Sequence, residues 1–122
     1  MGNTKAKKVL TAEAILSADD KRIVSVEVPE WGGIVYLRTI TGRERDEFES
    51  AALDASKRGD LRGLRAFLLA LCICNEDGER IFKDDDAPKL AQKNAAVLDR
   101  LFTRAQELNA LTERDINEIQ KN

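Results

Sequence analysis

The segment from Leu61 to Cys74 constrains the fold more than any other part of the chain. Its apolar side chains leave it scarcely any polar side toward its end: Leu64, Phe67, Leu68, Leu69, Leu71 and Ile73. A helix that is apolar nearly all round lies at the centre of a protein. Burial of these side chains contributes on the order of 12 kcal/mol before the loss of conformational entropy is counted. We therefore predict a central core helix over residues 61–74.

A change of the hydrophobic period to two predicts a β-hairpin over residues 21–40. Three valines at alternate positions would share one face of the first strand: Val24, Val26 and Val28. The residues between them would face the other way, as in a half-buried strand. Pro29 ends this strand because proline has no N–H to donate, and Gly32–Gly33 supplies the positive-φ freedom that a reversal needs. A second strand is expected over residues 34–40, which places Trp31 at the tip of the hairpin.

The spacing of Thr41 and Glu44 is that of a capping box, and it predicts where the next helix begins. The Thr41 hydroxyl can accept a hydrogen bond from the backbone N–H of Glu44, whose carboxylate can accept one from the N–H of Thr41. We expect this helix to run to about Lys57, where Arg58-Gly59-Asp60 breaks it. Its apolar face would carry small residues around one aromatic ring: Phe48, Ala51, Ala52 and Ala55.

Weaker helical signals occur at both ends of the chain. Thr11 can cap a short helix that ends near Asp19–Asp20. After a turn over residues 75–78, Ile81–Phe82 is expected to pack back onto the core. Apolar side chains at helical spacing predict a long helix over residues 95–111, and Thr112 can cap a last short one. That last helix would carry two apolar residues: Ile116 and Ile119.

The predicted fold class is α+β and predominantly α-helical, with one β-hairpin packed against a bundle of four to five helices. The length of 122 residues fits one domain with one core. We expect a flexible N-terminal arm over residues 1–10 and a single globular domain over residues 11–122. Within it, the hairpin would occupy about residues 21–40 and the helices about residues 42–122.

The composition excludes several classes of function. Histidine is absent, whereas serine and cysteine triads, proton shuttles near neutral pH and most zinc sites depend on imidazole. The 20 basic and 22 acidic residues nearly cancel, at a net charge of −2, so the basic footprint of a nucleic-acid-binding protein is missing. No apolar run reaches the roughly 18 residues at which a membrane span becomes plausible. We expect no enzyme activity, no cofactor, no nucleic acid and no membrane.

The two cysteines indicate a reducing compartment. Cys72 and Cys74 lie two residues apart, and in a helix their side chains would project about 200° apart, because each residue turns the helix by about 100°. A disulfide between them is therefore implausible, and buried thiols are the better interpretation. The basic start of the chain is followed by no apolar signal segment, so secretion is not supported.

Neither of the acidic clusters predicts a chemical site. Asp84-Asp85-Asp86 lacks the alternating spacing of a calcium loop, and it precedes Pro88, where acidic residues complement the dipole of a starting helix. The second cluster alternates with Arg43 and Arg45 and is typical of a solvated, salt-bridged helix face rather than a general acid–base pair. Its members are Glu44, Asp46, Glu47 and Glu49. No catalytic or metal-binding residue is expected.

Five residues are candidates for contact with a partner protein. Trp31 at a normally wet hairpin tip either folds back as a local lid or faces a partner, and tryptophan is enriched at binding hot spots. Tyr36 lies nearby on the second strand. Arg58, Arg62 and Arg65 have near-helical spacing and could form a basic stripe. The alternative for these arginines is an ordinary charged, exposed face.

A longer segment carries a family resemblance. It consists of Val26-Glu27-Val28-Pro29-Glu30-Trp31-Gly32-Gly33, then Val35-Tyr36-Leu37-Arg38-Thr39, then Thr41-Gly42-Arg43-Glu44-Arg45-Asp46. It resembles the hairpin-to-helix signature of phage tail assembly chaperones, in which a Trp-Gly-Gly turn joins two strands and a Thr-Gly-x-Glu-Arg-Asp helix start follows. The close match covers about a sixth of the chain, and the helical remainder agrees in general character.

The resemblance implies a non-catalytic protein of the infected host's cytoplasm. Such chaperones coat the long, helical tape measure protein before the tail tube polymerises. In many long-tailed phages a longer form, made by programmed frameshifting, recruits the tail tube protein. The resemblance leaves a homo-oligomer open, and it implies absence from the mature virion. The alternative is a structural phage or prophage protein, such as a head–tail connector or tail component that stays in the particle.

Overall fold

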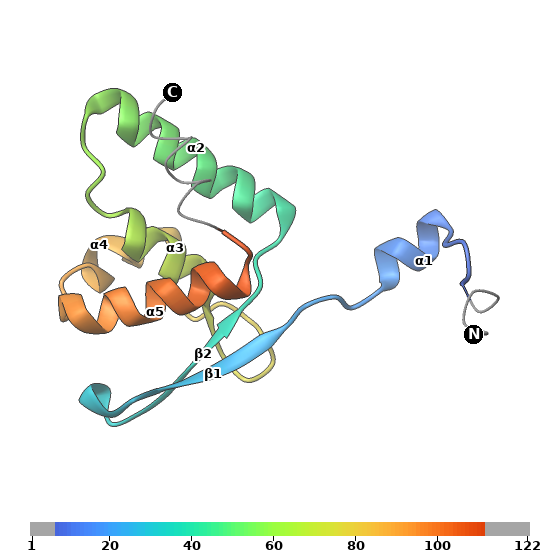
Figure 1. Cartoon of the computed structure of the whole chain (residues 1–122), viewed down its shortest axis with the longest axis horizontal. Coiled ribbons are helices and arrows are strands. Elements are labelled where there is room, and N and C mark those ends of the chain that lie inside the picture. Colours follow the sequence, from blue (N-terminus) through green and yellow to red (C-terminus); the bar gives the residue numbers. More distant parts are fainter. Residues whose placement is uncertain (1–6, 112–122) are drawn as a thin grey trace.

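The computed structural model describes residues 7–111, and Figure 1 shows their arrangement. The elements in chain order are α1 (Ala12–Ser17), β1 (Ile23–Val28), the 3-10 turn η2 (Pro29–Trp31), β2 (Gly33–Arg38), α2 (Gly42–Arg58), α3 (Leu64–Cys72), β3 (Ile73–Cys74), the 3-10 turn η3 (Asp84–Asp86), α4 (Ala87–Leu90) and α5 (Ala95–Leu108). This is a mostly helical α+β fold, as predicted, although the sheet has three strands rather than two. The helix predicted from Thr112, with Ile116 and Ile119, lies outside the described residues.

The predicted hairpin is confirmed. β1 and β2 are antiparallel, with Val24 opposite Leu37 and Val28 opposite Gly33. The three valines of β1 face the core, as their alternation predicts: Val28 is fully buried, and Val24 and Val26 pack against the core. Gly32 closes the turn with a φ of 78°, a backbone conformation that favours glycine.

The prediction of one helix over residues 61–74 is wrong at both ends. α3 begins only at Leu64, after Gly63 with a φ of 89°. At the other end, Ile73 and Cys74 form β3, which pairs antiparallel with Leu37 and Tyr36 of β2. A strand replaces the last helical turn because β2 offers a free edge of backbone N–H and C=O groups that these two residues satisfy. The helix predicted over residues 95–111 also ends early, at Leu108.

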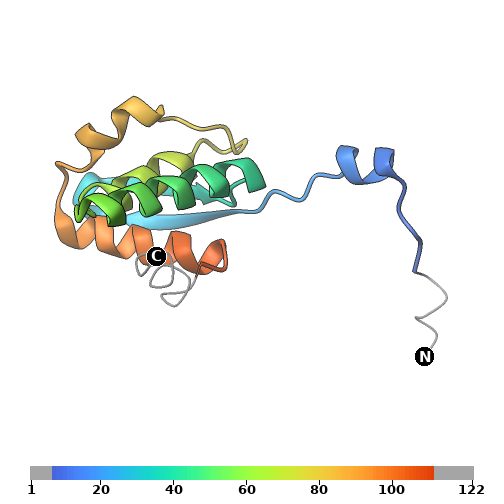
Figure 2. The same ribbon diagram turned by 90° about the horizontal axis from the view of Figure 1, so that it is seen from above.

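The centre of the core is α3, as its composition predicts. Five consecutive side chains of this helix are completely buried: Leu68, Leu69, Ala70, Leu71 and Cys72. Figure 2 shows α5 on one side of α3 and α4 on the other. α2 contributes Phe48, whose ring stacks on Phe67 of α3 with centroids 6.4 Å apart. The apolar faces of the sheet, α2, α4 and α5 therefore meet around one helix.

Two segments are less enclosed than the core. α1 contains no buried residue, and in both views it stands apart from the other elements at the end of an extended connection (Figures 1 and 2). Phe82 packs against the core as predicted, but the prediction for Ile81 is wrong, because this side chain is 55% exposed.

Among the described residues, no helix is long and apolar enough to cross a membrane.

Candidate protein-binding surface

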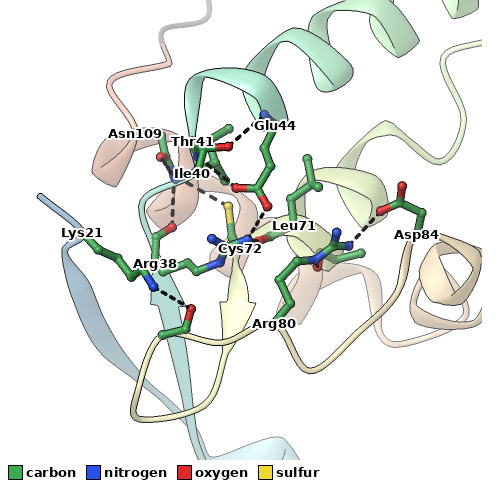
Figure 3. Close-up of polar contacts among 12 residues, drawn as sticks. Lys21, Arg38, Ile40, Thr41, Glu44, Leu71, Cys72, Arg80, Asp84 and Asn109 are labelled. Carbon is green, nitrogen blue, oxygen red and sulfur yellow. Dashed lines mark hydrogen bonds and ion pairs between the residues drawn. The ribbon is translucent and has the colours of Figure 1, made fainter. Parts of the chain in front are cut away.

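A buried polar cluster holds the hairpin against the helices (Figure 3). Arg38 at the end of β2 donates from Nη2 to Glu44 Oε2 at 2.6 Å and to the carbonyl oxygen of Leu71 at 2.7 Å. Glu44 at the same time completes the predicted capping box, because it accepts from the N–H of Thr41 at 2.9 Å while its own N–H donates to the Thr41 hydroxyl at 3.1 Å. One carboxylate thus connects β2 to the start of α2.

Asn109, just after α5, joins the same cluster from the other side. Its Oδ1 accepts from the N–H of Ile40 at 2.8 Å, and its Nδ2 donates to the carbonyl oxygen of Ala105 at 3.0 Å. Nδ2 also lies 3.6 Å from Sγ of Cys72. Each of these two residues also has a partner far away in the chain. Arg38 and Leu71 are 33 positions apart, and Ile40 and Asn109 are 69 apart, so the sequence carries no local signal for these contacts.

The carboxylates of the described residues show no arrangement typical of chemistry. Asp84 forms an ion pair with Arg80 at 2.9 Å, and Asp86 accepts from the backbone N–H of Lys83 at 2.9 Å. Glu49 pairs with Arg45 along α2 at 3.3 Å. Within residues 7–111, no three His, Cys, Asp or Glu side chains come together where they could hold a metal ion. These acidic side chains form ion pairs or accept hydrogen bonds at the start of a helical segment.

Trp31 is partly buried and packs against the core. Nζ of Lys93, from the connection between α4 and α5, lies 5.8 Å from the centre of its ring. The neighbouring Glu30 forms a bidentate pair with Arg100 of α5, with contacts of 2.7 and 3.0 Å. The hydrogen bonds from Arg100 lower the pKa of Glu30 to about 2. The hairpin tip is therefore fastened to α5, and Trp31 covers part of the core while it keeps an exposed edge.

The three candidate arginines lie on two helices and the connection between them rather than along one helical stripe. Arg58 ends α2, Arg62 lies in the connection, and Arg65 is in the first turn of α3. Arg62 forms a bidentate pair with Asp60 at 2.8 and 2.9 Å, which holds the pKa of that carboxyl well below its usual range. Arg65 pairs with Asp99 of α5 at 2.9 Å.

A small hollow lies between the start of α3 and the start of α5, and we call it the α3–α5 hollow. Its volume is about 180 Å³, and it is lined by Gly63, Arg65, Ala66, Ala91, Lys93, Ala95, Leu98 and Asp99. Arg65 also lines a second, more open depression together with Arg62. Since Lys93 borders the hollow and contacts Trp31, three of the five candidates surround one region: Trp31, Arg62 and Arg65.

Tyr36 lies elsewhere. It is partly buried in β2, where it pairs with Ser25 of β1 and Cys74 of β3. Because alternate residues of a strand face opposite sides, Tyr36 faces away from the side of the sheet on which Val35 and Leu37 pack. The alanines that line the α3–α5 hollow were missed from the sequence, since alanines at helical spacing do not distinguish a hollow from a packed interface.

Comparison with known proteins identifies the family. Residues 10–122 match the model of the family described as phage tail assembly chaperone. No curated protein matches the chain. A solved structure, that of the tail assembly chaperone of bacteriophage HK97, superimposes with a TM-score of 0.58 at 22% sequence identity, covering 79% of this chain and 90% of that chain. This likeness shows a shared fold. The family is non-catalytic, and the prediction from residues 26–46 is confirmed: the chain belongs to the phage tail assembly chaperones.

Proposed function

We propose that this chaperone binds the tape measure protein of its phage in the host cytoplasm and keeps it from aggregating until the tail tube polymerises around it. The observation that carries the proposal is the family match over residues 10–122. A long helical client exposes apolar stripes, and a groove-bearing helical module can mask an amphipathic helix. Many weak contacts along one client would be sufficient for tight overall binding.

We further propose that the client docks at the α3–α5 hollow. The uncharged side chains that line the hollow are small or apolar: Ala66, Ala91, Ala95 and Leu98. Such a lining can accept one apolar side chain of a client helix. The charged rim of Arg65, Lys93 and Asp99 would then pair with polar residues on either side of that apolar stripe. Trp31 and Arg62 would extend this surface, whereas Arg58 and Tyr36 are outlying candidates.

A longer form of the chain, made by frameshifting, is the proposed route to the tail tube protein. In this arrangement the described residues hold the client, and the additional segment recruits tube subunits to it. The chaperone leaves when the tube closes, so the mature virion should not contain it.

The test is a pull-down of the tagged chain from cells that produce the phage, with partners identified by mass spectrometry. We expect one very long helical protein, together with the tube protein where the longer form is made. Purified virions should lack the chain. Recovery of portal or capsid proteins instead, or a stoichiometric amount of the chain in virions, would support a structural connector or tail component and contradict the proposal.

Point variants test the proposed surface. Arg65→Glu reverses a rim charge and should weaken client capture at least tenfold, which corresponds to about 1.4 kcal/mol. Arg104→Glu is the matched control, because Arg104 is also a half-exposed, ion-paired arginine, bound to Glu107 on another part of α5. The chain has a single tryptophan, so the emission of Trp31 should change on client binding. Equal capture by the two variants would place the client elsewhere.

A further inference from the structure

The two edges of the three-stranded sheet differ. On the β3 side, the chain that follows the strand covers the edge: the N–H of Asn75 donates to the carbonyl oxygen of Glu79 at 2.9 Å, and the N–H of Ile81 donates to that of Ile73 at 3.4 Å. On the other side, β1 is the last strand of the sheet, and no described residue pairs with its outer edge. β1 is therefore an edge strand whose backbone can accept one more strand.

The register of the hairpin determines which backbone groups of β1 point outward. In an antiparallel pair, the N–H and C=O groups of successive residues point alternately toward the partner strand and away from it. The backbone of Arg22 faces β2, because its carbonyl oxygen accepts from the N–H of Thr39 at 2.9 Å. By this alternation the valines of β1 also bond to β2, whereas Ser25 and Glu27 point their N–H and C=O groups outward. Both of these residues are exposed.

β1 lacks the features that commonly protect an edge strand from pairing, which are an edge lysine, a proline or a bulge. All six of its residues pair with β2 in unbroken register. Its single charge is Glu27, whose carboxylate forms no ion pair within residues 7–111. An open groove of about 590 Å³ borders the strand, between Val26 and Thr103 of α5, and Figure 2 shows the two elements next to each other. The edge is thus regular, exposed and bordered by space for side chains.

These features specify the chemistry of an occupant. Hydrogen bonding to the outward groups of Ser25 and Glu27 requires an extended backbone, as in other cases where a peptide adds a strand to a sheet. The side chains of such a strand alternate between its two faces. Those on the core side would enter the groove beside Val26, where apolar residues fit. Those on the other face would lie opposite Ser25 and Glu27, where a cation complements the free carboxylate.

We propose that an extended segment of a partner protein adds to the sheet at β1 as a fourth strand, with apolar residues at alternate positions and a lysine or arginine opposite Glu27. The groove beside β1 shares no residue with the α3–α5 hollow. One copy of the chain can therefore hold a helical client and an extended partner at the same time. The proposal goes beyond the binding of the tape measure protein and does not depend on it.

The first test follows amide hydrogen exchange of the full chain by NMR, with a soluble synthetic peptide in which valine alternates with threonine and one lysine. In the free protein, the amides of Ser25 and Glu27 should exchange rapidly, whereas those of Val24 and Val26 should be protected. Saturating peptide should protect the two outward amides as well. The same peptide with N-methyl groups at the residues that bond to β1 should bind at least about tenfold more weakly. The absence of saturable binding, or binding that leaves both outward amides unprotected, would overturn the proposal.

Variants of the protein test the backbone and the charge separately. Ser25→Pro removes an outward N–H but no bond to β2, a position at which an edge strand tolerates proline, and it should weaken peptide binding at least about tenfold. Ser25→Ala is the matched control, because it keeps the N–H and should bind as the wild type does. Glu27→Lys should reverse the preference, so that a peptide with glutamate in place of lysine binds more tightly. Circular dichroism checks that each variant folds, and the N-methylated peptide tests the same contact on the unaltered protein.

Two further outcomes would contradict the proposal. An unchanged preference for the lysine peptide in Glu27→Lys would show that this carboxylate does not face the partner. Protection of the Ser25 and Glu27 amides that rises with protein concentration, without peptide, would show that a second copy occupies the edge. Neither result bears on the tape measure protein, since capture of that client is tested separately by Arg65→Glu at the α3–α5 hollow.

Discussion

Arg38 and Glu44 form an ion pair that is almost fully enclosed, with side chains 6% and 15% exposed. Arg38 is the one buried charged residue among residues 7–111, and its Nε has no hydrogen-bond partner there. A buried charge is tolerated when it is paired and costs several kcal/mol when its partner is removed. The stability of the connection between β2 and α2 should therefore depend on the presence and the charge of the Glu44 carboxylate.

Replacement of Glu44 by alanine should lower the free energy of unfolding by about 3 kcal/mol, because it leaves the Arg38 guanidinium buried without its counter-charge and removes one half of the capping box. Urea unfolding followed by circular dichroism measures this change. Glu49→Ala is the control, since Glu49 forms a more exposed pair along α2 and should cost less than about 1 kcal/mol. Equal losses would show that enclosure of the Arg38–Glu44 pair is unimportant.

The same pair predicts a pH dependence. Burial acts to raise the pKa of Glu44, but the hydrogen bonds from Arg38 and from the Thr41 N–H outweigh it and lower the pKa below the ordinary value of 4.5. A carboxyl with a lowered pKa stabilises the fold above its unfolded pKa, and this stabilisation is lost as the pH falls through the folded value. The stability difference between the wild type and Glu44→Gln should be constant above pH 4.5 and shrink at more acid pH. A constant difference throughout would contradict the shifted pKa.

Replacement of a core leucine by alanine should lower the stability of the fold far more than replacement of a surface leucine. Leu68→Ala in α3 removes a fully buried side chain and should cost about 3 kcal/mol, from lost transfer energy and the cavity that remains. Leu61→Ala, three residues before α3 begins, should change stability by no more than about 0.5 kcal/mol. Chemical unfolding of the two variants measures the contrast. A large loss from Leu61→Ala would mean that this leucine belongs to the core after all.

The two glycines at the start and just after the end of α2, Gly42 and Gly59, should change stability in opposite directions when replaced by alanine. Gly59 ends the helix with a φ of 69° and has open space around the position of a Cβ, so Gly59→Ala should cost about 1 kcal/mol from backbone strain alone. Gly42 begins the helix, also with open space, and Gly42→Ala should stabilise by about 0.5 kcal/mol by restricting the unfolded chain. Thermal unfolding distinguishes the two signs.

Both cysteines should be unreactive in the folded protein. Burial raises the pKa of the Cys72 thiol to about 12 and also raises that of Cys74, so neither is a thiolate near neutral pH, and the thiolate is the reactive form. A thiol-specific chromogenic reagent should titrate two groups in guanidinium chloride and almost none under native conditions. Rapid reaction of the native protein would show that this part of the core opens readily.

Local patterns predicted the elements whose causes are local. The alternating valines of β1 identified the strand, and the Thr41–Glu44 spacing identified the first residue of α2, because in both cases the determining contacts span only a few residues. The strand formed by Ile73–Cys74 could not be predicted in this way. These residues continue a helical pattern, and only the free edge of β2, more than thirty residues earlier in the chain, turns them into a strand.

The candidate surface was predicted only in part for the same reason. Trp31 and Arg65 stand out by residue type. Their proximity to one hollow depends on Lys93, in the connection before α5, and on Asp99 in α5, about thirty residues after Arg65. The polar cluster of Arg38 and Asn109 likewise has no local signature. Contacts between residues far apart in the chain determine both the candidate surface and the polar cluster, and local sequence patterns do not predict such contacts.

The contact between Ile40 and Asn109 also sets an order of events during synthesis. The backbone N–H of Ile40 donates to Asn109, which is synthesised 69 residues later. Glu30 at the hairpin tip pairs with Arg100, which is synthesised 70 residues later. Until α5 emerges, these early contacts stay unmade, and Val26 and Val35 lack part of the core that covers them. A protein whose family protects others during assembly is therefore itself incomplete for most of its own translation.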